Sequence, residues 1–231
     1  MTAHWVFLHG FTNTPRVWTP IIQSMAITAR SLSPEYPATA DIDAIGRLVW
    51  DECPDNAVLV GHSLGGYVAL AMLAQRPAAV AGIALVNSHA GADTEAAQAI
   101  REQSAQAADA GKYSQLVEAV TKRVYHPDNL SNDHLMRHRE AEAIGYGAAR
   151  FAAHQRACAR RPDREAVLRQ FTGAKFVVTS EIDLVIDPAE QRSLAQRCDA
   201  AFHSIGGAGH MLPAEQPQRL AAQLTAWGCA L

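Results

Sequence analysis

Residues 57–66, Ala57-Val58-Leu59-Val60-Gly61-His62-Ser63-Leu64-Gly65-Gly66, decide how this chain folds. The first four are a continuous apolar run, which is typical of a strand buried on both faces of a parallel sheet. A helical segment follows at 64–76 and ends before Pro77. The sequence therefore places Ser63 on a sharp turn between a strand and a helix.

The Gly-x-Ser-x-Gly pattern of this turn is typical of a nucleophilic serine. We expect glycines two residues before and after Ser63 because side chains there would strike the neighbouring strand and helix. The turn holds the hydroxyl above the sheet, beside the helix N-terminus, where negative charge is stabilised. A chance match in a glycine-containing turn is the alternative, and the strand before and the helix after argue against it. Ser63 is therefore the predicted nucleophile.

Strands and helices alternate outward from this turn. Apolar runs predict strands at 5–8, 83–86, 176–179 and 201–205, with a weaker one at 29–32. Helical patterns cover 15–25 (interrupted by Pro20), 41–53, 188–198 and 214–227. This alternation predicts right-handed β-α-β units and an α/β sandwich.

The alternation stops for about eighty residues between 83–86 and 176–179. That stretch carries only Ala-rich amphipathic helix, broken by glycines and prolines. We expect a helical cap or lid over Ser63, with an apolar face that packs on the core; the apolar repeat is Leu116, Val117, Val120 and Val124. The predicted division is 91–171 for the cap, and 1–90 with 172–231 for a single core domain.

A nucleophilic serine needs a base, and the base needs an acid that orients it. Among ten histidines, His210 lies in the glycine-rich loop 206–213, directly after the last predicted strand. That position is the carboxyl edge of the sheet, where ligands meet open α/β sheets. His210 is therefore the predicted base, and an ordinary loop histidine is the alternative.

Three carboxylates follow the strand at 176–179 and compete for the role of the acid. Asp183 follows the strand end by the few residues needed to reach a histidine on the adjacent loop. Asp187 precedes Pro188 and suits the cap of the next helix, and Glu181 is the other rival. We favour Asp183, which gives the chain order Ser, Asp, His.

His9-Gly10-Phe11 ends the first strand and faces the serine turn across the sheet edge. Gly10 is expected to let the backbone bend, so that the N–H groups of Phe11 and Leu64 form an oxyanion hole. We expect His9 and His62 to be supporting or pocket-lining residues. The candidate substrate-pocket residues are His9, His62, Trp18, Tyr67 and Tyr125, although packing is the commoner role for aromatic side chains.

His9-Gly10-Phe11, the turn at 61–66, Asp183 and Gly209-His210 together resemble the α/β-hydrolase superfamily, in its compact bacterial esterase-like branch. The resemblance implies the α/β-hydrolase fold, with about six mostly parallel strands flanked by helices and an inserted helical cap. The chain has no room for the two strands that usually precede the His-Gly strand. The family's glycine-rich loop before the second helix is replaced by 33–39 and cannot be mapped. A serine nucleophile excludes the dehalogenase and epoxide-hydrolase branches, which use a carboxylate.

This resemblance implies a serine hydrolase that cleaves a small-molecule carboxylic ester through an acyl-enzyme on Ser63, without a cofactor. Two alternatives stay open. A lyase or C–C bond enzyme, as in the hydroxynitrile lyases and the menaquinone-pathway synthase of this superfamily, would use the same residues as a proton shuttle. A non-catalytic receptor would keep the pocket for a small molecule and lose turnover.

Composition sets further limits. With 20 basic and 23 acidic residues, a net charge of −3 argues against a nucleic-acid groove or a polybasic membrane surface. No apolar stretch approaches the ~20 residues of a membrane span, and the start of the chain lacks signal-peptide features. Four scattered cysteines indicate reduced thiols rather than disulfides or a zinc site. A cytoplasmic location is expected.

Two patterns in the cap segment need weighing. His134 and His138 are spaced for one helix face, but the glutamate of an H-E-x-x-H motif is missing, so no metal is expected. Eight arginines and four acidic residues lie between Arg137 and Arg169. A solvated helix face is the favoured interpretation. If instead Arg137 and Arg139 point inward, the substrate is anionic.

Overall fold

The computed structural model describes residues 3–25 and 31–229. Within them, one parallel sheet holds six strands in the order β2-β1-β3-β4-β5-β6. The strands are β1 (His4–Leu8), β2 (Ser31–Leu32), β3 (Ala57–His62), β4 (Val80–Val86), β5 (Ala174–Ser180) and β6 (Ala201–Ile205). The expected sheet of about six parallel strands is confirmed. The first half of the weak strand predicted at 29–32 lies outside the described residues.

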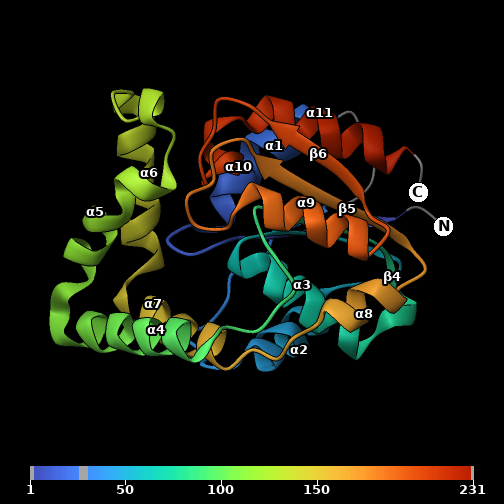
Figure 1. Cartoon of the computed structure of the whole chain (residues 1–231), viewed down its shortest axis with the longest axis horizontal. Coiled ribbons are helices and arrows are strands. Elements are labelled where there is room, and N and C mark those ends of the chain that lie inside the picture. Colours follow the sequence, from blue (N-terminus) through green and yellow to red (C-terminus); the bar gives the residue numbers. More distant parts are fainter. Residues whose placement is uncertain (1–2, 26–30, 230–231) are drawn as a thin grey trace.

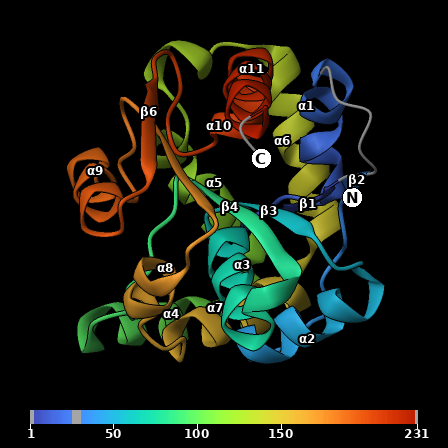
Figure 2. The ribbon, with the colours of Figure 1, turned by 90° about the vertical axis from the view of Figure 1, so that its right-hand side faces the viewer.

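Helices cover both faces of the sheet (Figures 1 and 2). On one face lie α2 (Ile42–Glu52), α3 (Leu64–Gln75) and α9 (Pro188–Arg197), and on the other α1 (Thr19–Ser24) and α11 (Pro217–Gly228). Val6 and Leu8 of β1 join the first core, whereas Trp5 and Phe7 join the second, because strand side chains alternate between faces. Pro20 lies in the first turn of α1, where its missing N–H removes no helical hydrogen bond.

The segment between β4 and β5 is helical throughout and contains no strand over residues 91–171, all of which are described. Its helices are α4 (Glu95–Ala107), a π-helical turn (Ala108–Lys112), α5 (Tyr113–Val124), a short 3-10 turn (Pro127–Asn129), α6 (Asp133–Tyr146), α7 (Ala148–Ala159) and α8 (Glu165–Gln170). Figure 1 shows α4 beside α7 along one side of the molecule, with α5 and α6 standing at its end. The chain turns at Gly111 and Gly147, which both have positive φ.

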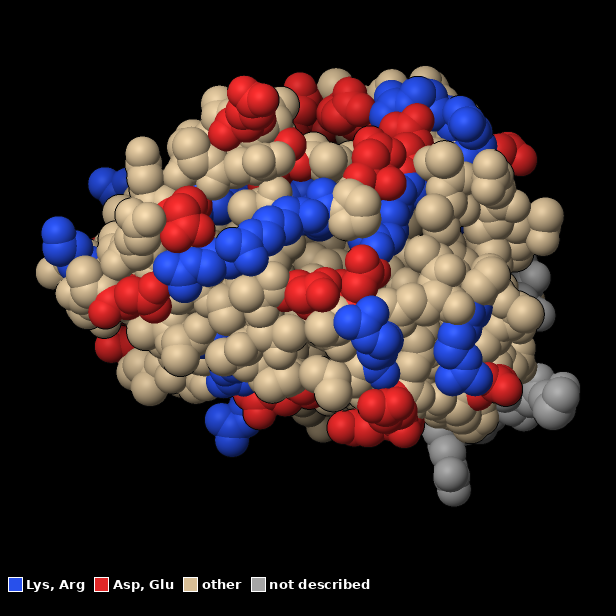
Figure 3. Space-filling view, turned by 90° about the horizontal axis from the view of Figure 1, so that it is seen from below, with Lys and Arg blue, Asp and Glu red and all other residues tan. Residues whose placement is uncertain are grey.

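Acidic and basic side chains are interspersed on the face shown in Figure 3. This mixing agrees with the nearly balanced composition of the chain. Among the described residues, no helix combines the length and apolar character needed to cross a membrane. Cys53, Cys158 and Cys198 are buried free thiols, and Cys229 is an exposed one.

Candidate active site

Ser63 occupies a strained turn between β3 and α3. Its φ of 51° and ψ of −116° are sparsely populated for a residue with a side chain. The Ser63 N–H donates to the carbonyl of Val86 at 3.0 Å, and its own carbonyl accepts from Gly66 N and Ser88 Oγ, both at 2.9 Å. These bonds hold the strained backbone in place, so the position of the serine is set by β4 as well as by its own turn.

Glycines make this turn sterically possible. A Cβ on Gly65 would overlap the backbone carbonyl of Leu8 in β1, and a Cβ on Gly61 would overlap the carbonyl of Gly65. The expectation that side chains here strike the neighbouring strand and helix is confirmed. Gly10 does not have a positive φ, but a Cβ there would lie 2.7 Å from Nδ1 of His62, so the position needs a glycine for space.

Ser63, His210 and Asp183 meet at the carboxyl edge of the sheet. His210 Nε2 lies 2.9 Å from Ser63 Oγ, and His210 Nδ1 lies 2.9 Å and 3.0 Å from the two carboxylate oxygens of Asp183. All three residues are buried. Since the carboxylate only accepts, Nδ1 carries the proton and Nε2 is left to accept from the serine hydroxyl.

Asp183 is held in the charged form. Its Oδ1 accepts from the N–H groups of Val185 and Ile186 at 2.8 Å and 3.0 Å. Burial alone would raise the pKa of Asp183, but the charge and hydrogen bond of His210 and these amides outweigh it and leave the pKa below its ordinary value. A charged acceptor that is fixed in this way orients the imidazole of His210.

The two rival carboxylates lie elsewhere. Asp187 accepts from Ala189 N at 2.8 Å and caps α9, as its position before Pro188 predicted. Glu181 lies beside Gly206. Of the three, Asp183 contacts His210.

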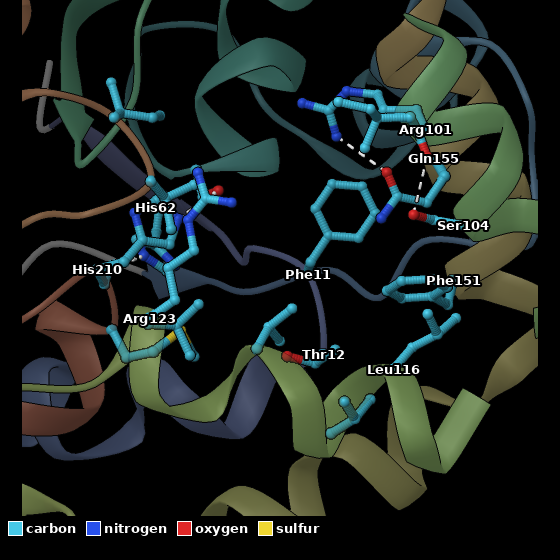
Figure 4. A pocket seen from close by; sticks show the side chains of 18 of the residues that line it. Phe11, Thr12, His62, Arg101, Ser104, Leu116, Arg123, Phe151, Gln155 and His210 are labelled. Carbon is cyan, nitrogen blue, oxygen red and sulfur yellow. Dashed lines mark hydrogen bonds between the residues drawn. The ribbon is translucent and has the colours of Figure 1, made fainter. Parts of the chain in front are cut away.

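Phe11 and Leu64, whose N–H groups are the predicted oxyanion hole, come from the loop after β1 and from the start of α3. Leu64 is the first residue of α3, so its N–H has no acceptor within the helix. Phe11 follows β1 and lines the cavity in front of Ser63, where Figure 4 shows its ring near the centre. The turn continues through Thr12, whose φ is +57°.

His62 and His9 are both fully buried, but only His62 reaches the cavity. His62 Nε2 donates to the carbonyl of His210 at 2.8 Å. The ring of His9 stacks on Tyr36 with the centroids 4.2 Å apart, behind the sheet edge. Burial lowers the pKa of each to about 3, so both are neutral. The expectation that His9 lines the pocket is wrong.

The expectation that Trp18 lines the substrate pocket is also wrong. Trp18 is fully buried in the core on the α1 face of the sheet, with its ring 5.3 Å from that of Phe7. Tyr67 and Tyr125, in contrast, line the cavity. Trp18 and Tyr67 therefore lie on opposite faces of the sheet, which helical spacing alone does not reveal.

The cavity beside Ser63 has a volume of about 430 Å³. One wall is the apolar repeat of α5, formed by Leu116, Val117, Val120 and Val124. Val120 is 42% exposed, so this repeat faces the cavity and does not pack fully on the core as expected. Figure 4 shows Leu116 and Phe151 at one end of the cavity and His210 at the other.

A charged cluster of Asp93, Arg101 and Arg161 adjoins the cavity, and Asp93 and Arg101 line it. Arg161 contacts Asp93 at 2.7 Å, Arg101 pairs with the same carboxylate, and the Arg161 guanidinium lies 4.0 Å from the centroid of Tyr67. The Arg161 and Asp93 side chains are only 2% and 8% exposed, and that of Arg101 is 22% exposed. Burial and the nearby Arg161 lower the pKa of His89 to about 4, so it adds no charge. Two guanidinium groups thus share one carboxylate, which leaves one excess positive charge.

The arginines singled out in the sequence have different positions. Arg137 is exposed and does not line the cavity, which matches the solvated-face interpretation. Arg139 does line it, and its guanidinium donates to the carbonyl of Val117. The alternative in which both arginines point inward is wrong for Arg137.

Sequence reasoning also missed two buried polar residues that hold loops next to the site. Asn87 directly follows β4 with φ +43°, and its amide donates to the carbonyl of His210 at 2.9 Å. An asparagine just after a strand, at the carboxyl edge, was the available signal. The carboxylate of Glu142 in α6 is buried and accepts from Thr14 N at 2.6 Å, which ties α6 to the loop after Phe11. Nothing local in the sequence marks Glu142.

The two buried neutral histidines predict acid sensitivity. Below pH 6.5 the unfolded chain protonates His9 and His62, whereas the folded chain does not until about pH 3. Stability is therefore complete above pH 6.5 and falls as the pH drops toward 3, by about 1.4 kcal/mol per pH unit for each histidine. From pH 7.5 to 5.5, urea unfolding should show a loss of about 3 kcal/mol from these two residues. Unchanged stability over this range would contradict their burial in the neutral form.

A six-stranded parallel sheet with a serine, a histidine and an aspartate in contact at its carboxyl edge defines an α/β-hydrolase. Residues 5–223 match the family described as "Alpha/beta hydrolase family". The chain belongs to this family.

Named relatives differ in activity. An Escherichia coli 2-succinyl-6-hydroxy-2,4-cyclohexadiene-1-carboxylate synthase is 29% identical over 95% of this chain and 91% of its own length. A pimeloyl-[acyl-carrier protein] methyl ester esterase of Aromatoleum aromaticum is 33% identical over 36% of each chain. Among solved structures, a thermophilic esterase from Thermogutta terrifontis superposes with a TM-score of 0.90 at 21% identity, over 98% of this chain and 89% of that one.

Proposed function

We propose that the protein is a serine hydrolase that cleaves small-molecule carboxylic esters. The observation that carries the proposal is the continuous contact from Asp183 through His210 to the hydroxyl of Ser63 at the wall of the cavity. The esterase of Aromatoleum aromaticum adds support over about a third of the chain.

In this proposal Ser63 attacks the ester carbonyl while His210 Nε2 takes the hydroxyl proton. Asp183 stabilises the imidazolium that forms, and the N–H groups of Phe11 and Leu64 bind the oxyanion. His210 then protonates the leaving alcohol, and an acyl-enzyme remains on Ser63. A water molecule, activated by the same histidine, releases the acid.

We also propose that residues 91–171 act as the cap of this site, over a core of residues 1–90 and 172–231. Support comes from the apolar repeat of α5, which lines the same cavity as Ser63. Such a cap excludes water from the developing charge and shapes the acyl pocket.

The substrate in this proposal carries a carboxylate. The support is the excess positive charge of the cluster of Arg101, Asp93 and Arg161, of which Arg101 and Asp93 line the cavity, since buried charges are normally paired. The guanidinium of Arg101 lies 5.8 Å from the ring centroid of Phe11, on the oxyanion side of the cavity. A carboxylate on the acyl chain would complete the pairing there.

Replacing Arg101 by Gln tests this charge selection. The remaining Arg161–Asp93 pair is neutral, so this cluster loses its excess charge, while Arg123 and Arg139 still line the cavity. We expect kcat/KM for mono-p-nitrophenyl succinate to fall by about tenfold or more, and kcat/KM for the neutral p-nitrophenyl valerate to stay nearly unchanged. Arg137→Gln, at an exposed position of α6 outside the cavity, is the matched control and should change neither. Equal losses on both esters would refute the carboxylate proposal.

The second candidate is a lyase or C–C bond enzyme on the same scaffold. The specific observation in its favour is the Escherichia coli synthase, which is similar over nearly the whole chain. In that case His210 and Ser63 move a proton, and no acyl group is attached to the serine. The two candidates therefore differ in one covalent species.

A further inference from the structure

Side chains at the ends of the sheet strands donate hydrogen bonds to the backbone carbonyl groups of the loop that carries His210. The amide of Asn87 donates to the carbonyls of Gly209 and His210 at 3.1 Å and 2.9 Å. Ser180 Oγ donates to the Gly209 carbonyl at 2.6 Å, and His62 Nε2 donates to that of His210. These donors come from the ends of β3, β4 and β5, and they fix one side of the loop to the core.

The N–H groups on either side of His210 point to different partners. Gly209 N–H donates to Glu215 Oε1 at 2.8 Å, and Met211 N–H donates to the carbonyl of Val124 at 3.0 Å. Glu215 is the last residue of α10 (Leu212–Glu215), and Val124 is the last residue of α5. The second side of the loop is therefore fixed by Glu215 and by the inserted segment.

Glu215 itself is bound to that segment. Its Oε2 accepts from the backbone N–H of His126 and from the side-chain amide of Asn129, both at 2.7 Å. The backbone of Gly209 approaches so closely that a Cβ there would lie 2.8 Å from His126 N. Three donors thus converge on the two oxygens of one half-buried carboxylate, and two of them are backbone groups that cannot reverse their polarity.

We infer that Glu215 is a positioning residue for His210, and that it acts by joining residues 124–129 of the inserted segment to the histidine loop. The inference rests on the proposed function, since it takes His210 as the base that serves Ser63. The inserted segment then has a second role besides covering the cavity. It sets where the catalytic imidazole lies.

Glu215→Gln tests the inference with little change in shape. Asn129 can turn its own amide to suit a glutamine, but the N–H groups of Gly209 and His126 cannot turn. Because the glutamine has a single acceptor oxygen, one of these two backbone groups loses its partner. The loop should shift relative to Ser63 while the cavity residues of α5 stay in place.

We expect Glu215→Gln to lower kcat by about tenfold or more with KM near the wild-type value, since a small misplacement of a reacting group is costly. The rate at which a fluorophosphonate probe labels Ser63 should fall by a similar factor. Both rates are divided by the concentration of folded protein, and circular dichroism at the assay temperature gives the folded fraction. Glu190→Gln, an exposed charge removal on α9, is the control and should leave both rates unchanged.

Asn129→Ala is the second variant, and it guards against a misfolded Glu215→Gln protein. It removes one donor to the carboxylate of Glu215 and keeps the hydrogen bonds from the N–H groups of Gly209 and His126. We expect it to lower kcat by a smaller factor than Glu215→Gln does. If both variants lose thermal stability while kcat and labelling per folded molecule stay at the wild-type level, Glu215 is merely structural and the inference is wrong. A rise in KM alone would also overturn it. If wild-type Ser63 itself fails to react with the probe, the proposed function fails first.

Discussion

Ser63→Ala is expected to lower the turnover of p-nitrophenyl acetate by about 10⁴-fold or more. The change removes the only protein atom that forms a bond to the acyl group in the proposed reaction. Stability should barely change, because alanine accepts the same backbone strain as serine and the bond from Ser63 N to Val86 O does not involve the side chain. Initial rates and thermal unfolding of the two proteins together measure the effect.

Ser104→Ala is the matched control, since Ser104 also lines the cavity but lies on α4, away from His210 (Figure 4). This variant should retain most of the wild-type rate. Turnover by Ser63→Ala at a rate near wild type would mean that another group, or a general base acting on water, performs the hydrolysis.

Asp183→Asn should lower kcat by about 10³- to 10⁴-fold with the fold intact. The N–H groups of Val185 and Ile186 bind Oδ1, so they retain the amide oxygen of an asparagine at that position. Its NH₂ then replaces Oδ2, which lies 2.9 Å from His210 Nδ1. Because the NH₂ donates, it favours the His210 tautomer that has a proton on Nε2 and cannot accept from Ser63.

The two rival carboxylates provide the controls for this assignment. Glu181→Gln and Asp187→Asn remove the same charge from the same loop, but neither carboxylate contacts His210. Both should keep kcat close to wild type, although Asp187→Asn weakens the cap of α9. A loss as large as that of Asp183→Asn in either variant would show that the acid is assigned to the wrong residue.

The sequence predicted those features that depend on residues close together in the chain, because such features leave a recognisable pattern of residue types. The glycines around Ser63 are such a pattern, because the backbones of Leu8 and Gly65 leave no room for a Cβ. The cap function of Asp187 is another, since it depends only on the residues that follow. The order of strands and helices is encoded in the same way, by apolar runs and by prolines that end them.

What the sequence did not reveal depends on residues far apart in the chain. Helical spacing shows that Trp18 faces a core, but not that this core lies on the opposite side of the sheet from the cavity. Asp93 and Arg161 form a buried ion pair across 68 positions, and Arg101 joins them from α4. A count of arginines in the inserted segment gives no indication of which are paired, which are exposed and which line the cavity. Glu215 likewise meets His126 only after the inserted segment has packed against the histidine loop.

The most direct test of the proposed ester hydrolysis is intact-protein mass spectrometry on samples quenched in acid within the first turnovers of mono-p-nitrophenyl succinate. We expect a covalent adduct with the mass of the acyl group, located on Ser63 by peptide mapping and absent from Ser63→Ala. It should accompany a burst of p-nitrophenol equal to the enzyme concentration if deacylation is slower than acylation. Steady turnover that depends on Ser63, without any adduct even when deacylation is slowed at low temperature, would contradict the acyl-enzyme mechanism and favour proton-shuttle chemistry.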